Sequence, residues 1–241
     1  FLKEASRAGA KVIIVQDPAQ IKSRGIGDVG RLLADKYGFA ETSTVIRQKV
    51  GWQKQASEKL NTHEILDGLK PYYEKGRINW FMNANAARGK LSQDYLTGSG
   101  NRMVLAYTND EVRKLNSHIH DALKNREDLT KHFQISGIEY SVGDRIRFTQ
   151  NDNHGQFIKN VPDSLKERFV STKTVGVKNG SLGEIHSFEK DVLMVKLDDG
   201  RIVKTNTKDY EHFTHGYAMS IHKSEGSTFD RTYVLASRFM D

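Results

Sequence analysis

The stretch HGYAMSIHKSEGSTFDRTYVLAS, from His215 to Ser237, decides how the chain is interpreted. Tyr217–Ile221 alternates apolar and small residues as a buried strand does, and Thr232–Ala236 has the composition of a second core strand. The loop between them is polar and contains Gly226, where the backbone can approach a ligand closely. Open α/β sheets bind ligands at the carboxyl ends of their strands, so this stretch predicts a ligand-binding loop in such a sheet.

The same stretch resembles motif V of superfamily 1 helicases, in the RecD-type branch that includes TraA-like conjugative relaxase/helicases. The resemblance implies an α/β fold with RecA-like P-loop NTPase motor domains. It implies that some residues of the loop contact DNA, namely Ser220, His222, Lys223 and Ser224. Two others would lie near the nucleotide, namely Glu225 and Gly226. The family usually has Gln at position 225, and a carboxylate there cannot donate a hydrogen bond at neutral pH.

Two segments near the start of the chain resemble further helicase motifs. Lys11–Val15 is a continuous apolar run, as in a strand buried in a parallel sheet, and the residues after it, up to Gln20, resemble motif III. Val45–Gln48 resembles motif IV. The resemblance gives Gln20 and Arg47 catalytic roles at the γ-phosphate, where an amide or a guanidinium can stabilise phosphoryl charge. Two positions depart from the family's usual Gly and Arg, namely Gln16 and Ile46.

The composition of the chain excludes some classes of site and favours others. The chain has 241 residues, no cysteine and a formal net charge of +7, with its basic residues dispersed. Disulfides and cysteine metal sites are excluded, and the charge favours a polyanion held in a folded groove. The nine histidines show no ligand spacing such as HxxxH, which predicts no metal site. The absence of cysteine fits a reducing, cytoplasmic location. No apolar run is long enough to span a membrane, so we expect no membrane insertion.

The remaining pattern predicts the domain organisation. We expect helices over Leu2–Ala8, Val29–Tyr37 and Trp52–Leu60, and another that is interrupted or closed near Pro71. Gly38 should end the second of these helices. Arg102–Tyr107 is a predicted core strand, followed by a helix. The predicted divisions are a partial first RecA-like domain (1–60), a connector (61–101), a second RecA-like domain (102–138 and 211–241) and a small SH3-like β-barrel inserted in it (139–210).

The β insert has its own predicted features. Val142–Phe148 alternates like one half-exposed strand. Further short strands follow between tight turns, with Asp198–Gly200 as a hairpin signal and residues 152–175 as an extra loop. Thr108 is a candidate DNA-backbone contact and equally a helix N-cap. In the insert, the candidate DNA contacts are Lys178, Asn179 and Arg201, for which turn formation and solvated charge are equally good explanations.

The sequence contains no GxxxxGK[ST] and no Walker B acidic strand, and it stops where motif VI should begin. We therefore expect a piece of a longer ATP-dependent helicase, with ATP and Mg²⁺ as cofactors of the intact protein and no ATPase activity from this chain alone. The expected partners are single-stranded DNA and conjugation proteins of the relaxosome and type IV secretion system. The alternative is a non-catalytic DNA-binding remnant of a decayed transfer helicase.

Overall fold

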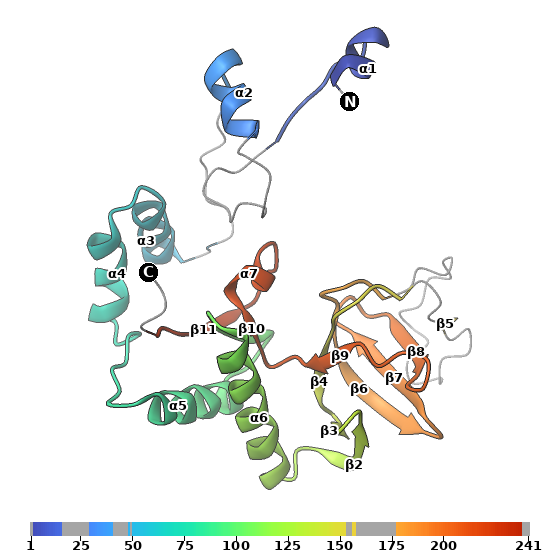
Figure 1. The fold of residues 1–241 in the computed structure, drawn as a ribbon. Coiled ribbons are helices and arrows are strands. Elements are labelled where there is room, and N and C mark those ends of the chain that lie inside the picture. Colours follow the sequence, from blue (N-terminus) through green and yellow to red (C-terminus); the bar gives the residue numbers. More distant parts are fainter. Residues whose placement is uncertain are drawn as a thin grey trace. The chain divides into compact units, whose positions relative to one another are not determined.

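The computed structural model describes residues 2–15, 29–40, 48, 50–152, 156–157 and 177–237 (Figure 1). The chain divides into two compact units, Phe1–Trp80 and Phe81–Asp241. This division falls inside the predicted connector, and the predicted domain boundaries stay predictions. Within the described residues, no helix is both long and apolar enough to cross a membrane.

The first unit is helical in its described residues. Its helices are α1 (Leu2–Arg7), α2 (Val29–Tyr37), α3 (Gly51–Asn61) and α4 (Ile65–Glu74). Gly38 follows α2 with φ of 77°, a left-handed conformation that favours glycine and ends the helix as predicted. Helices α3 and α4 pack through Trp52 and Tyr72, whose ring centroids are 4.9 Å apart. The predicted interruption at Pro71 is absent, because α4 continues through it to Glu74.

The predicted strand Lys11–Val15 is not formed. The segment has no regular secondary structure, and Ile13 and Val15 are 76% and 91% exposed. A strand satisfies its backbone through a neighbouring strand, and the described part of the first unit contains none. The apolar composition of the run therefore led to a wrong prediction, because these residues do not form a strand in this structure.

The second unit contains a three-stranded parallel sheet in the order β10-β1-β11. Its strands are β1 (Arg102–Ala106), β10 (Ala218–Ser220) and β11 (Arg231–Leu235), which confirms the strands predicted around both motifs. Two helices pack with this sheet, α5 (Ala84–Thr97), which the sequence analysis missed, and α6 (Asn109–Asn125). Their shared apolar core includes Val104, Leu115, Ile119 and Leu235.

A separate six-stranded sheet has the order β5-β8-β7-β6-β4-β9, with every pair antiparallel (Figure 1). Its strands are β4 (Arg145–Phe148), β5 (Gln156–Phe157), β6 (Leu182–Glu189), β7 (Val192–Leu197), β8 (Ile202–Asn206) and β9 (Phe213–His215). Phe148, Ile185, Leu193 and Val195 are among its buried core residues. The sheet extends through β9 to His215, past the predicted end of the insert at residue 210.

The predicted single strand Val142–Phe148 is two strands. A hairpin of β2 (Thr130–Ile135) and β3 (Ile138–Val142) precedes β4, and the chain turns between β3 and β4 at Gly143 and Asp144. Gly143 has φ of 97°, and the Asp144 amide donates to the Ser141 carbonyl at 3.0 Å. The alternating pattern continued across this turn and concealed it.

Candidate nucleic-acid interface

The loop predicted from motif V begins where β10 ends. Ser220 is buried, and the chain then forms α7 (Ile221–Ser224), a single helical turn. The Ser224 hydroxyl donates to the Ile221 carbonyl at 2.7 Å and so stabilises that turn. Gly226 follows with φ of 80°. The side chains of His222, Lys223 and Glu225 are left exposed at the surface.

Parallel pairing brings this loop to the same sheet edge as Thr108. Ala106 at the end of β1 pairs in register with Ser220 at the end of β10, so both strands deliver their following residues to one edge. The rings of Tyr107 and His222 lie there with centroids 6.4 Å apart. The Thr108 hydroxyl accepts from the Glu111 amide at 3.2 Å as the N-cap of α6. The structure therefore shows the capping role, and the DNA role remains a prediction.

Lys223 lies in an electropositive setting. Partial burial, together with the positive charge of Arg147 on β4, lowers the pKa of its ammonium group. Arg147 is only 6% exposed, and its Nε has no hydrogen-bond partner among the described residues. Burial also lowers the pKa of Arg147. Two cations that repel one another are stabilised when an anion binds near them. A nucleic-acid phosphate is such an anion.

Arg147 was not singled out from the sequence. It lies two residues after Arg145 in an alternating strand, so both arginines are on the same face of the sheet, and nothing in the spacing distinguishes them. The structure does distinguish them, because Arg145 has an ion pair with Asp198 and a 3.3 Å hydrogen bond to Asn101. Arg145 thus ties the antiparallel sheet to the parallel one, while Arg147 supplies charge.

The candidate residues of the insert have local structural roles. Lys178 and Asn179 are exposed in a turn, where the Asn179 amide donates to the Asn151 side chain at 2.7 Å. Arg201 forms a 2.7 Å ion pair with Asp199 across the turn between β7 and β8. Their contribution to DNA binding stays a prediction. Gln20 and Arg47, the predicted catalytic residues, lie outside the described residues.

A cavity of about 270 Å³ lies between the antiparallel sheet and the segment after α7. Its walls carry the carboxylates of Asp198 and Asp199. Burial opposes the charge of Asp199, but hydrogen bonds from Arg201 hold the pKa of that carboxyl below its usual range. Both carboxylates form ion pairs with arginines, Asp198 with Arg145 and Asp199 with Arg201, so these cations are already engaged and the Lys223 side of the loop is the better DNA site. The other lining residues are Asn101, Ser181, Leu182, Leu197, Ser227, Thr228 and Phe229.

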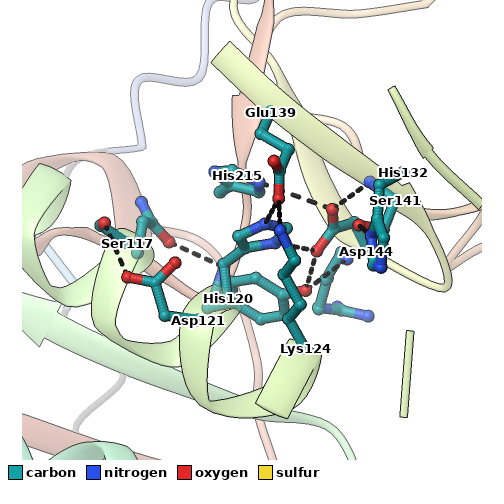
Figure 2. Close-up of polar contacts among 12 residues, drawn as sticks. Ser117, His120, Asp121, Lys124, His132, Glu139, Ser141, Asp144 and His215 are labelled. Carbon is teal, nitrogen blue, oxygen red and sulfur yellow. Dashed lines mark hydrogen bonds and ion pairs between the residues drawn. The ribbon is translucent and has the colours of Figure 1, made fainter. Parts of the chain in front are cut away.

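A buried polar cluster lies where α6 meets the antiparallel sheet (Figure 2). Asp144, fully buried, accepts from the Ser141 amide at 2.6 Å and from the Tyr217 hydroxyl, and its Oδ1 is 2.9 Å from His120 Nδ1. Burial opposes ionisation, but the hydrogen bonds from His120 and Tyr217, with the imidazole of His215 nearby, hold the pKa of Asp144 well below its usual range. Burial likewise disfavours a charged His120, yet Asp144 and Glu139 raise the pKa of this imidazole.

Comparison with known proteins gives matches along the whole chain. A family model described as an AAA domain matches residues 1–83. The conjugal transfer protein TraA of Agrobacterium fabrum (strain C58 / ATCC 33970) is 30% identical over 249 residues, and that of Rhizobium radiobacter is 29% identical over 251 residues. Both matches cover 100% of this chain and 21% of the relative, so the chain spans about a fifth of the length of these relatives.

Two solved structures share the fold. The crystal structure of Bacteroides Pif1 bound to ssDNA aligns with a TM-score of 0.52 at 19% identity, over 95% of this chain and 57% of that one. The Pif1 helicase from Bacteroides in complex with ADP-AlF3 and ssDNA aligns with a TM-score of 0.50, with the same identity and coverage. These alignments agree with the predicted α/β P-loop NTPase fold.

Proposed function

Since the chain matches a superfamily 1 helicase region of TraA-like proteins, we propose that it is part of an ATP-dependent translocase that moves on single-stranded DNA in conjugative transfer. Its role within that motor is to hold the DNA backbone at the carboxyl edge of the β10-β1-β11 sheet. We assign the protein to the RecD-type branch and the antiparallel sheet to an SH3-like insert that helps retain the strand. Conjugation proteins of the relaxosome and type IV secretion system are its proposed partners.

The exposed position of Lys223 in the loop after β10, at the sheet edge where β1 also ends, is the observation that carries this proposal. Lys223 belongs to the loop after β10, and Arg147 belongs to β4 of the antiparallel sheet, so cations from both sheets influence one another. The loop also offers the hydroxyl of Ser224 and the exposed imidazole of His222. Lysine, arginine and hydroxyl groups are the usual partners of nucleic-acid phosphates, which fix position without reading sequence.

ATP and Mg²⁺ are proposed for the intact protein only. Of the described residues, the loop at Gly226 can approach a nucleotide through its backbone. The sequence lacks the glycine-rich lysine loop that cradles the phosphates, so the residues present do not fit a complete nucleotide site, and no catalytic step is assigned to this chain. Gln20, Arg47, Glu225 and Gly226 remain the residues proposed to face nucleotide in the longer protein.

Salt-dependent binding tests the proposal. The chain is titrated into labelled oligo-dT and a matched duplex, with fluorescence anisotropy read at several salt concentrations. We expect tighter binding to the single strand, and Lys223→Ala should reduce the slope of log K against log salt by about 0.7, the value for one phosphate contact on a single strand.

Lys90→Ala is the matched control, because it removes the same charge from α5, where Lys90 pairs with Asp94. It should leave the slope unchanged. Equal effects of the two substitutions, or equal affinity for single strand and duplex, would contradict the proposed interface.

A further inference from the structure

Three potential metal ligands from distant parts of the chain meet in the cluster of Figure 2. They are His120 on α6, Asp144 in the turn between β3 and β4, and His215 at the end of β9, here called the His–Asp–His cluster. They are 4%, 0% and 8% exposed. One ligand atom from each residue lies within 4.8 Å of those of the other two.

Two imidazole nitrogens of this cluster, His120 Nε2 and His215 Nε2, have no hydrogen-bond partner among the described residues. His215 Nε2 is 3.6 Å from Asp144 Oδ2, which is too long for a hydrogen bond, and it has no other hydrogen-bond partner among the described residues. Buried polar atoms nearly always have a partner, so a buried imidazole nitrogen directed at a carboxylate without reaching it requires an explanation. A metal ion between the two atoms would give the His215 nitrogen the partner that it lacks.

We propose that the His–Asp–His cluster binds a divalent first-row transition metal ion of the Zn²⁺ type, with His120 Nδ1, a carboxylate oxygen of Asp144 and His215 Nε2 as its ligands. Two ligands about 2.1 Å from a tetrahedral Zn²⁺ lie about 3.4 Å apart. His120 Nδ1 is 2.9 Å from Asp144 Oδ1 and His215 Nε2 is 3.6 Å from Asp144 Oδ2, so each carboxylate oxygen faces one imidazole nitrogen at a distance close to that value. Imidazole nitrogens with one carboxylate favour such an ion over Mg²⁺ or Ca²⁺, which take oxygen ligands.

The surroundings hold the ligands in place. His120 presents Nδ1 to Asp144, and its other nitrogen, Nε2, is 3.5 Å from Glu139 Oε1. That separation is an ion-pair distance without a formed hydrogen bond, and Glu139 is the carboxylate to which this nitrogen would donate in a metal-bound state, as metal-bound histidines usually do. Glu139 is itself held by an ion pair with Lys124.

The second imidazole is fixed by aromatic rings. The His215 ring lies 4.7 Å from the ring of Tyr140, 4.6 Å from that of His120 and 5.9 Å from that of Tyr217, measured between centroids. Such packing restricts rotation of the imidazole and keeps its Nε2 directed at Asp144. An ion bound there would join α6 to the turn and strand of the antiparallel sheet. The inference goes beyond the proposed function and does not depend on DNA or nucleotide binding.

Metal binding to the full chain tests the inference directly. The chelator-treated protein is titrated with Co²⁺, whose visible absorption reports tetrahedral nitrogen and oxygen ligands, and then with Zn²⁺ as competitor. Elemental analysis after dialysis should give one Zn²⁺ per chain. His120→Gln and His215→Gln should each weaken binding by at least a hundred-fold, and Glu139→Gln by about 10–100-fold.

His118→Gln is the matched control, because His118 is an exposed histidine on the same helix as His120. It should bind as the unmodified chain does. Circular dichroism establishes that each variant is folded. Nitrogen-15 NMR spectra of the unmodified chain avoid any effect of a substitution on folding. In these spectra, Zn²⁺ should shift the imidazole signals of His120 and His215 alone. Absence of stoichiometric Zn²⁺, or an equal loss of metal affinity in His118→Gln, would overturn the inference. The cluster would then be stabilised by hydrogen bonds without a metal ion.

Discussion

Arg147→Met should stabilise the free chain while weakening its binding to single-stranded DNA. Arg147 is only 6% exposed, and its Nε lacks a hydrogen-bond partner among the described residues. A buried donor without a partner costs about 1–3 kcal/mol, and methionine fills a similar volume without that cost. The substitution also removes a positive charge that destabilises Lys223 in its charged form. We therefore expect the free energy of unfolding to rise by about 1–2 kcal/mol.

The assay has two readings on the same protein preparations. Urea unfolding followed by tryptophan fluorescence and circular dichroism gives the stability, and anisotropy with oligo-dT gives the affinity and salt slope. A gain of 1–2 kcal/mol corresponds to a rise of roughly 2–8 °C in Tm for a unit of this size. Since Arg147 is too buried to contact a phosphate itself, the affinity should fall while the salt slope changes by less than the ~0.7 expected for one lost contact.

Arg145→Met is the control, two residues along the same strand. Arg145 has an ion pair with Asp198 and a hydrogen bond to Asn101, so its loss should destabilise the chain. The two substitutions should thus change stability in opposite directions. A destabilised Arg147→Met with unchanged DNA binding would refute the reasoning, because it would show that Arg147 is a structural residue.

Two further substitutions test how the binding edge is built. Asn116→Ala should destabilise the chain by about 2–4 kcal/mol in urea unfolding, because its buried amide accepts from the Tyr217 and Ala218 amides at 3.0 and 2.8 Å and donates to the Ala218 carbonyl at 3.2 Å. The exposed Asn125→Ala, at the end of the same helix, should change stability by less than about 0.5 kcal/mol, and a similar loss from both would contradict the assignment. Thr108→Ala should cost about 1 kcal/mol through the lost cap on Glu111, and Thr108→Ser should restore it. If Thr108→Ser restored stability but not DNA affinity, the threonine methyl group would have a role that capping does not explain.

Local patterns were sufficient for much of the secondary structure. Val29–Tyr37 was predicted as a helix with Gly38 as its end, and the structure has both boundaries. The hairpin signal at Asp198–Gly200 and the cap at Thr108 were also correct, because each depends on residues adjacent in sequence. The helix α5 was missed, since its sequence has almost no apolar periodicity and it is fixed by tertiary contacts such as the bond from the Tyr233 hydroxyl to the Asp94 carbonyl.

The site was harder to predict because its parts are distant in sequence. The residues of the motif V loop are contiguous and were identified, whereas Arg147 acquires its role only when β4 lies near the loop after β10. His120 and Asp144 are 24 residues apart, and no short spacing rule relates them to each other or to His215. The sequence was therefore sufficient to predict the loop, whereas the groups around it became apparent only in the folded structure.

Gly216 lies at a close crossing between the antiparallel sheet and the chain that leads into the parallel sheet and its loop. It lies between His215, the last residue of β9, and Tyr217, which leads into β10. A Cβ on Gly216 would be 2.7 Å from the carbonyl carbon of Ile146, and the Gly216 amide donates to the Arg145 carbonyl at 2.7 Å. Only a residue without a side chain permits that contact between β4 and the crossing chain. The antiparallel sheet, the His–Asp–His cluster and the Lys223 loop are therefore held within a few residues of one tight crossing, and a displacement of β4 there would also displace the start of β10.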